Sequence, residues 1–211
     1  MDSIELSPKV TAIYQAIVRL FMEGADLNNL TVAEITARAG IGKGTAYEYF
    51  SNKEEMIAGA LFYEMKRVCQ NLCEQIKQQK DLHGKINFIL MNMEEHIANT
   101  NCVFRSFHVM MGNSAVSSRL KEMVSKKQED EILIPDIIRI IIEEEMENAK
   151  ELTEEDKAYL MMMVFSKIIC FALYQISAKK ELNLESSTMR ELICRNINSE
   201  IEHFKIDKTE V

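Results

Sequence analysis

The residues best suited to chemistry with another molecule lie between residues 43 and 50. Ala46 and Phe50 stand four residues apart, so on a helix both can face a core. The side chains that then point outward are Lys43, Thr45, Tyr47, Glu48 and Tyr49. A cation and hydroxyl groups suit contacts to DNA phosphates and base edges, and Thr45 and Tyr47 are the best candidates for reading bases. We call residues 43–49 the recognition strip.

Alternatives exist for several residues of this strip. The tyrosines could simply pack against a neighbouring helix of the same chain. Gly44 has no side chain, so it would let another backbone approach the helix closely. Glu48 would repel phosphate unless it accepted a hydrogen bond from a cytosine amino group, and a position facing sideways to solvent is the simpler interpretation.

Helix-start signals make this strip the third of three short helices. Ser7 before Pro8 predicts the start of a first helix. Thr31, followed three residues later by Glu34, is a capping box that starts a second helix. The Gly-Ile-Gly sequence at residues 40–42 breaks that helix, and the third helix follows at once. Two short helices joined by a glycine turn predict a helix-turn-helix, whose latter helix enters the major groove of DNA.

The rest of the chain is predicted to be helical as well. Only two prolines and seven glycines occur in 211 residues, and a second capping box, Ser51 with Glu54, starts a long fourth helix. Further helices are expected at about residues 82–99, 101–111, 115–148, 154–179 and 187–205, with Pro135 kinking or dividing the third of these. The sequence therefore predicts an all-α protein of about nine helices. Residues 1–53 would form a three-helix DNA-binding domain and residues 54–211 a larger helical domain.

The segment TVAEITARAGIGKGTAYEYFSNKEEM, residues 31–56, resembles the signature of the TetR/AcrR family of bacterial transcriptional regulators. Gly42 stands where serine is frequent in that pattern, and Ala46 stands where leucine is frequent. Carried over by position, the resemblance implies phosphate contacts at Thr31, Tyr49 and Lys53. It also implies base or backbone contacts at Lys43, Gly44, Thr45 and Tyr47.

The same resemblance implies a function. The protein would be a ligand-responsive regulator, a repressor released from a palindromic double-stranded operator when a small, largely apolar effector binds the C-terminal domain. The effector would wedge the fourth helix and move Lys53, so that binding of DNA and of effector would be reciprocally coupled. Such proteins act as homodimers, which place paired recognition helices about one DNA turn, roughly 34 Å, apart.

Candidates for the effector and dimer contacts come from the later helices. Fourteen methionines make an adaptable interior that could line an apolar cavity. The candidate lining residues are Phe62, Met65, Cys69, Met93, His96, Phe104, Phe107, His108 and Met111, although a filled core is the alternative for each. The candidate dimer residues are Leu160, Val164, Ile168, Phe171, Leu192, Ile193, Ile197, Ile201 and Phe204, some of which must also belong to the chain's own core.

Composition narrows the class of protein further. The net charge of -8 argues against an unspecific cationic coat for nucleic acid or membranes, and residues 1–53 carry five basic against six acidic side chains. The most apolar segment, residues 159–176, holds Lys167 near its middle, which favours a core or interface helix over a membrane span. The N-terminus lacks a secretory signal, and five scattered cysteines fit a reduced compartment. We expect a cytoplasmic protein without membrane contact.

Two other classes of function compete with DNA regulation by a small effector. Cys69 and Cys73 lie four residues apart and could serve a thiol- or metal-responsive regulator with Cys102 or a histidine nearby. Two thiols supply only half of a metal site, and buried free cysteines are the alternative. No Ser-His-Asp order, phosphate-cradling glycine loop or HExxH motif occurs, so no enzymatic activity, cofactor or metal is predicted. A pure protein-interaction module would not need the recognition strip.

Overall fold

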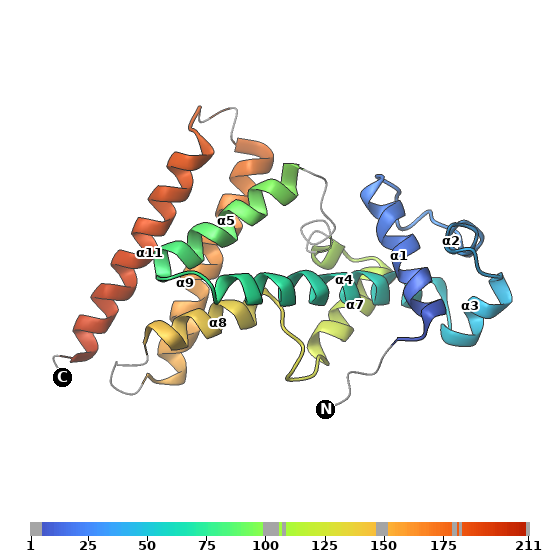
Figure 1. Ribbon diagram of the computed structural model, residues 1–211, viewed down its shortest axis with the longest axis horizontal. Helices are drawn as coiled ribbons and strands as arrows, with labels where there is room; N and C mark the ends of the chain where they lie inside the picture. Colours follow the sequence, from blue (N-terminus) through green and yellow to red (C-terminus); the bar gives the residue numbers. More distant parts are fainter. Residues whose placement is uncertain are drawn as a thin grey trace. The chain divides into compact units, whose positions relative to one another are not determined.

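The protein is helical throughout the residues that its computed structural model describes, which are 6–98, 106, 109–146, 152–178, 181 and 183–209. Ten helical elements and no strand occur in these residues, against about nine helices expected (Figure 1). The prediction of an all-α fold is therefore confirmed. The helix predicted over residues 101–111 lies largely outside the described residues.

Contacts between helices divide the chain into two compact units. One unit consists of Met1–Val68 with Thr100–Glu131, and the other of Cys69–Asn99 with Ile132–Val211. The helix α4, Lys53–Ile76, runs without interruption from one unit into the other. The domain boundary predicted after residue 53 separates two functions and not two sets of packed helices. It stays a prediction.

Three short helices open the first unit. These are α1 (Pro8–Met22), α2 (Val32–Ala39) and α3 (Lys43–Tyr49), and each contacts the other two. Figure 1 shows them in blue to cyan, packed side by side. Their shared core consists of apolar side chains that recur at helical spacing: Val10, Ile13, Ile17, Phe21, Val32, Ile35 and Ala46. Burying this stripe is what stabilises helices that are too short to persist alone.

The predicted caps of the first two helices are confirmed. The Ser7 hydroxyl accepts a hydrogen bond from the Val10 amide at 3.3 Å. The Thr31 hydroxyl accepts from the Glu34 amide at 3.2 Å, while the Glu34 carboxylate accepts from the Thr31 amide at 2.8 Å. Gly40 ends α2 with φ of +68°, a left-handed conformation that glycine adopts at little cost. These local signals fix where the recognition strip begins.

The cap predicted for α4 is wrong by one residue. Asn52, not Ser51, caps the helix. Its side-chain oxygen accepts a hydrogen bond from the Glu55 backbone amide at 2.8 Å. Glu55, not Glu54, reaches back to accept from the Ser51 amide at 2.8 Å. Asparagine caps helices as well as serine does, so the pattern one position later competes on equal terms with the predicted one.

An aromatic cluster fastens α1 to α4 within the first unit. The Tyr14 ring centroid lies 5.7 Å from that of Phe50 and 5.7 Å from that of Tyr63. Gly59 of α4 makes room for Tyr14, because a β-carbon at Gly59 would stand 2.5 Å from the Tyr14 hydroxyl oxygen. Burial and the nearby Glu55 carboxylate both raise the pKa of Tyr14. The glycine in this helix is therefore required by a close approach of an aromatic side chain.

The helix α7, Ala115–Ser125, also belongs to the first unit. Ser114 caps it, accepting from the Ser117 amide at 3.1 Å. The helix ends at Ser125, and α8 does not begin until Ile134, so the predicted long helix over residues 115–148 is divided. Pro135 lies in the first turn of α8, where its missing N–H costs nothing.

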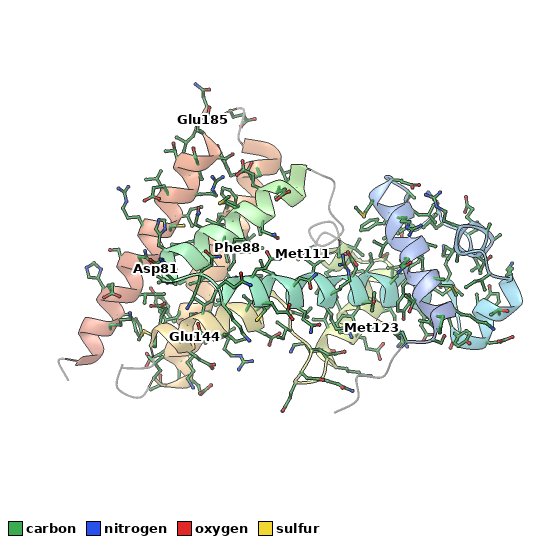
Figure 2. All side chains as sticks on the ribbon, viewed as in Figure 1. Asp81, Phe88, Met111, Met123, Glu144 and Glu185 are labelled. Carbon is green, nitrogen blue, oxygen red and sulfur yellow. The ribbon has the colours of Figure 1, made fainter. Side chains whose placement is uncertain are left out.

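Four helices form the second unit, together with the end of α4. They are α5 (Leu82–Ala98), α8 (Ile134–Glu145), α9 (Glu154–Leu173) and α11 (Ser186–Thr209), and a π-helical turn, Tyr174–Ala178, extends α9. The Lys85 ammonium on α5 donates to Glu144 on α8 at 2.7 Å, a residue labelled in Figure 2. Arg190 on α11 pairs with Glu94 on α5.

One segment of this unit, Glu154–Ile176, is long and apolar enough by length and composition to cross a membrane. Length and composition alone do not identify a membrane span, since the core helix of a soluble protein has the same properties. Here Leu160, Val164 and Ile168 are at most 1% exposed and belong to the core of the chain. The segment as a whole is 39% buried in its most apolar window, so one stripe of it belongs to the core and other side chains are exposed.

Candidate nucleic-acid interface

The recognition strip is turned outward as its spacing predicts. Ala46 is fully buried and Phe50 is 6% exposed, so the inner face of α3 is closed. Tyr47 and Tyr49 are 48% and 41% exposed, Lys43 and Glu48 are exposed, and Thr45 is half-buried. Packing within the chain therefore leaves a large part of both tyrosine side chains accessible. The strip presents a cation and hydroxyl groups to the surroundings, the groups that suit phosphates and base edges.

The glycine inside the strip has no internal explanation. A β-carbon built on Gly44 would meet no atom within 4 Å, and Gly44 does not have a positive φ. Neither the backbone nor a packed neighbour demands glycine there. A glycine that its own fold does not need is consistent with close approach of another molecule, which is the role predicted from sequence.

Thr31 stands at the start of α2, and its side chain is already engaged. Its hydroxyl donates to the Glu34 carboxylate at 2.7 Å, and hydrogen bonds from Thr31 lower the pKa of Glu34. A phosphate contact from this hydroxyl would have to replace the bond to Glu34.

Lys53 lies in the first turn of α4, and its ammonium donates to the Asn28 backbone carbonyl at 2.8 Å. Asn28 precedes Thr31 by three residues, a stretch that spans at most about 10 Å. The contact therefore brings Lys53 near Thr31, although the two are 22 residues apart in sequence. Sequence reasoning missed Asn28, because a backbone carbonyl leaves no signal in the residue type.

The predicted effector residues are distributed over both units. Phe62 and Met65 lie in the first unit, where the Lys66 ammonium stands 4.6 Å from the Phe62 ring centroid. Cys69 and Met93 lie in the second. Met111, labelled in Figure 2, is 71% exposed. Phe104, Phe107, His108 and the side chain of His96 lie outside the described residues, so this lining stays a prediction.

The two candidate sensor thiols are buried. Cys69 is 1% exposed and Cys73 is 4% exposed, and burial raises the pKa of Cys69 to about 12. A thiol must ionise to attack an oxidant or bind a metal, so this environment makes Cys69 unreactive. The described part of the chain holds no group of three or more metal-ligating side chains, and Cys102 lies outside it.

This burial predicts how stability should respond to alkaline pH. An unfolded cysteine loses its proton near pH 8.5 to 9, whereas the folded Cys69 keeps it until about pH 12. Below pH 8.5 the Cys69 thiol is protonated in both the folded and the unfolded state, and its contribution to the free energy of unfolding is fully present. As pH rises from there toward 12, ionisation of the thiol favours the unfolded state. Cys69 should therefore cost roughly 1.4 kcal/mol of folding free energy per pH unit above 9.

Urea unfolding of the native protein and of Cys69→Ala at pH 7, 9 and 10.5 measures that loss. The difference in unfolding free energy between the two proteins should shrink as pH rises. Labelling the folded protein with a thiol reagent supplies a second readout, in which the exposed Cys170 should react and Cys69 should not. Fast labelling of Cys69 in the folded state would show that its environment is not closed.

The predicted dimer residues fall mostly inside the chain's own core. Six of them are at most 1% exposed: Leu160, Val164, Ile168, Phe171, Ile197 and Ile201. Ile193 and Phe204 are half-buried, and Phe204 stacks on Tyr159 with centroids 6.1 Å apart. Only Leu192 of the set is exposed, at 40%. A contact with a second copy through these helices would need other side chains on their outer faces.

The outer faces of α9 and α11 do carry apolar side chains. Met162, Leu173, Ile176 and Leu192 are 40% to 69% exposed. A groove of about 480 Å³ runs here, with Phe171, Tyr174 and Ile193 among its lining residues. Sequence reasoning missed this surface because it chose Leu160, Val164, Ile168 and Phe171 for the dimer contact, and these side chains are buried.

Comparison with known proteins agrees with this geometry. Residues 13–60 match the model of the family described as bacterial regulatory proteins, tetR family. No curated protein sequence matches the chain. Among solved structures, the fold is similar to FadR from Bacillus subtilis in complex with stearoyl-CoA, with a TM-score of 0.62, 16% identity, and coverage of 89% of this chain and 96% of that one.

Two further structures have the same fold. The fatty acid degradation regulator FadR from Bacillus halodurans has a TM-score of 0.63 at 17% identity, covering 92% of this chain and 96% of that one. FadR from Thermus thermophilus, a TetR family transcriptional repressor in complex with lauroyl-CoA, has a TM-score of 0.61 at 14% identity, covering 89% and 92%. Residues 13–60 of this chain therefore match the N-terminal domain of the tetR family of bacterial regulatory proteins, and its helical fold is similar to that of the FadR structures.

Proposed function

We propose that this protein is a cytoplasmic, ligand-responsive transcriptional repressor that reads a palindromic operator with the recognition strip. The observation that carries the proposal is the division of α3 into a closed inner face, Ala46 and Phe50, and an outer face with two half-exposed tyrosines. The exposed parts of Tyr47 and Tyr49 leave their hydroxyl groups and ring edges available to another molecule. The major groove admits a helix of this size, and DNA offers partners for each group on the strip.

Single substitutions on the strip should separate the phosphate contacts from the base contacts. Lys43→Ala and Tyr49→Phe should weaken binding to every DNA sequence, because each removes a sequence-independent contact. Thr45→Ala should change the preference between operators, at about 1 to 3 kcal/mol for the base concerned. A palindromic operator selected from a random DNA pool, and variants of it, provide the probes for fluorescence anisotropy.

Lys80→Ala is the matched control, since it removes the same charge from an exposed position outside the first unit. Its affinity for the operator should stay near that of the native protein. Equal losses for Thr45→Ala on every DNA tested would sink its assignment to base reading. Unchanged binding for both Lys43→Ala and Tyr49→Phe would remove the proposal that the strip contacts DNA.

We infer that a second copy of the chain binds the outer faces of α9 and α11. Contiguous exposed apolar surface on a soluble protein marks an interaction site. Leu173 and Leu192 are exposed and line one groove here, and Met162 is exposed on the same helix as Leu173. A two-fold dimer would match the two half-sites of a palindrome. The dimer contact would thus be made by the predicted helices, α9 and α11. It would use their exposed side chains and not the buried ones that the sequence analysis named.

The effector we propose is a molecule with a long apolar part, bound by residues 54–211. The FadR structures that share the fold contain stearoyl-CoA and lauroyl-CoA, which supports an acyl-CoA as the first molecule to try. Stearoyl-CoA should release the protein from its operator, and free coenzyme A is the control that keeps the charge but lacks the acyl chain. If stearoyl-CoA binds and operator affinity does not change, coupling between the two sites is absent.

Coupling would pass through the start of α4. The Arg119 guanidinium on α7 lies 3.4 Å from the Glu55 carboxylate, and the same carboxylate accepts from the Ser51 amide where α3 leads into α4. The Ser51 hydrogen bond, more than Arg119, lowers the pKa of Glu55. A shift of α7 would therefore act on the turn that joins the recognition strip to Lys53, and by linkage DNA binding would act back on the effector.

A further inference from the structure

We propose that Asp26 is a positioning residue for DNA binding, which holds the ammonium of Lys53 in place through the backbone carbonyl of Asn28. The proposal rests on the proposed function, because the role that it assigns to Asp26 is a role in DNA binding. Asp26 itself lies outside the recognition strip. Asp26 carries a negative charge in a domain that would face phosphate. Its contribution would therefore come from hydrogen bonding rather than from its charge.

Asp26 organises the loop between α1 and α2 with both its side chain and its backbone. Its carboxylate accepts from the Asn28 amide at 3.0 Å and from the Asn29 side-chain amide at 2.7 Å. Its carbonyl accepts from the backbone amides of Asn29 and Leu30, both at 3.1 Å. Leu27 and Leu30 are 5% and 6% exposed and anchor the loop in the core. The peptide of Asn28 is thus held from both sides.

The Asn28 carbonyl then takes one of the three hydrogens of the Lys53 ammonium, at 2.8 Å. Two hydrogens remain for a phosphate. A free lysine head group loses conformational freedom when it binds, whereas one already held near its binding position loses less. The loop thereby prepares Lys53 for a phosphate beside the start of α2, where Thr31 stands.

This role predicts an effect opposite in sign to that of charge. Removing a carboxylate near DNA should raise affinity if only electrostatics mattered. If Asp26 positions Lys53, Asp26→Ala should instead weaken operator binding by about 3-fold to 10-fold. Asp26→Asn keeps an oxygen that can accept from the Asn28 amide while losing the charge, so its affinity should equal or exceed that of the native protein.

The experiment measures operator affinity by fluorescence anisotropy at several salt concentrations for Asp26→Ala, Asp26→Asn, Lys53→Ala and the double variant Asp26→Ala/Lys53→Ala. Lys53→Ala should lower the slope of log affinity against log salt by about 1. In the Lys53→Ala background, Asp26→Ala should cause no further loss, because the group that it positions is gone. Circular dichroism melting of each variant reports whether it folds.

Tighter binding by Asp26→Ala, or the same loss with and without Lys53, would overturn the positioning role. A loss of operator affinity in Asp26→Asn would also overturn the positioning role. The asparagine variant is the control for the case in which the loop merely unfolds in Asp26→Ala. The proposed function is judged separately by Lys43→Ala and Tyr49→Phe. If those two weaken binding and Asp26→Ala does not, only the role of Asp26 fails.

Discussion

Replacing Gly44 with alanine is expected to make the protein more stable and a much poorer DNA binder. Gly44 lies in the first turn of α3, where alanine favours helix over glycine by up to about 1 kcal/mol. No atom lies within 4 Å of the added β-carbon, so the fold offers no steric objection. Under the proposed function the methyl group would project into the space that a DNA backbone would enter, and we expect a loss of at least about tenfold in operator affinity, or roughly 1.4 kcal/mol.

Thermal unfolding and operator titration of the same preparation test both halves of this prediction. For a chain of this length, 1 kcal/mol corresponds to a rise of roughly 2 to 4 °C in Tm. Ser118→Ala on α7 is the matched control, since it is an exposed helical position where alanine also favours helix. It should raise Tm without weakening DNA binding. Native affinity in Gly44→Ala would mean that no DNA backbone approaches this turn.

Local signals predicted the first fifty residues well. Thr31 with Glu34 forms the capping box that its spacing indicates, Gly40 ends the helix in a left-handed conformation, and Ala46 is buried. The capping box and the glycine end depend on residues within four positions of one another, so the sequence contains the whole interaction, and the spacing of Ala46 and Phe50 indicates which face of α3 is apolar. The one local error, Ser51 for Asn52, arose where two adjacent residues can both cap a helix.

Contacts between distant segments left no comparable signal. On α9 nearly every position from Leu160 to Leu173 is apolar, so periodicity could not show which stripe faces inward. Leu160 and Val164 are buried while Met162 and Leu173 are exposed, a choice made by packing against the other helices of the unit. The hydrogen bond from Lys53 to Asn28 likewise depends on the folding of a loop and not on its residue types.

Gly59→Ala should have the opposite effect on stability from Gly44→Ala, although both place alanine in a helix. The new β-carbon would lie 2.5 Å from the Tyr14 hydroxyl oxygen and 3.0 Å from its Cζ. Tyr14 has little freedom to move, because its ring lies against Phe50 and Tyr63. Overpacking of this kind costs about 1 to 3 kcal/mol, more than the helical preference for alanine returns. We therefore expect a lower Tm.

DNA binding should weaken in the same variant, even though Gly59 is buried and cannot contact DNA. Displacing the Tyr14 ring pushes on Phe50, the residue that closes the inner face of α3, and so disturbs the orientation of the recognition strip. A loss of threefold or more in operator affinity is expected, since DNA contacts tolerate little misplacement. The comparison with Gly44→Ala separates the two ways of losing affinity, one with a raised Tm and the other with a lowered Tm.

Tyr14→Phe provides the control that identifies the cause. It removes the hydroxyl oxygen at 2.5 Å, so it should restore much of the stability and affinity lost in Gly59→Ala. A double-mutant cycle over the two positions should give an interaction energy of about 1 kcal/mol, as expected for side chains in contact. Additive effects would mean that Gly59→Ala acts elsewhere than on Tyr14. Restoration would instead identify the packing of α1 on α4 as what holds the recognition strip ready for DNA.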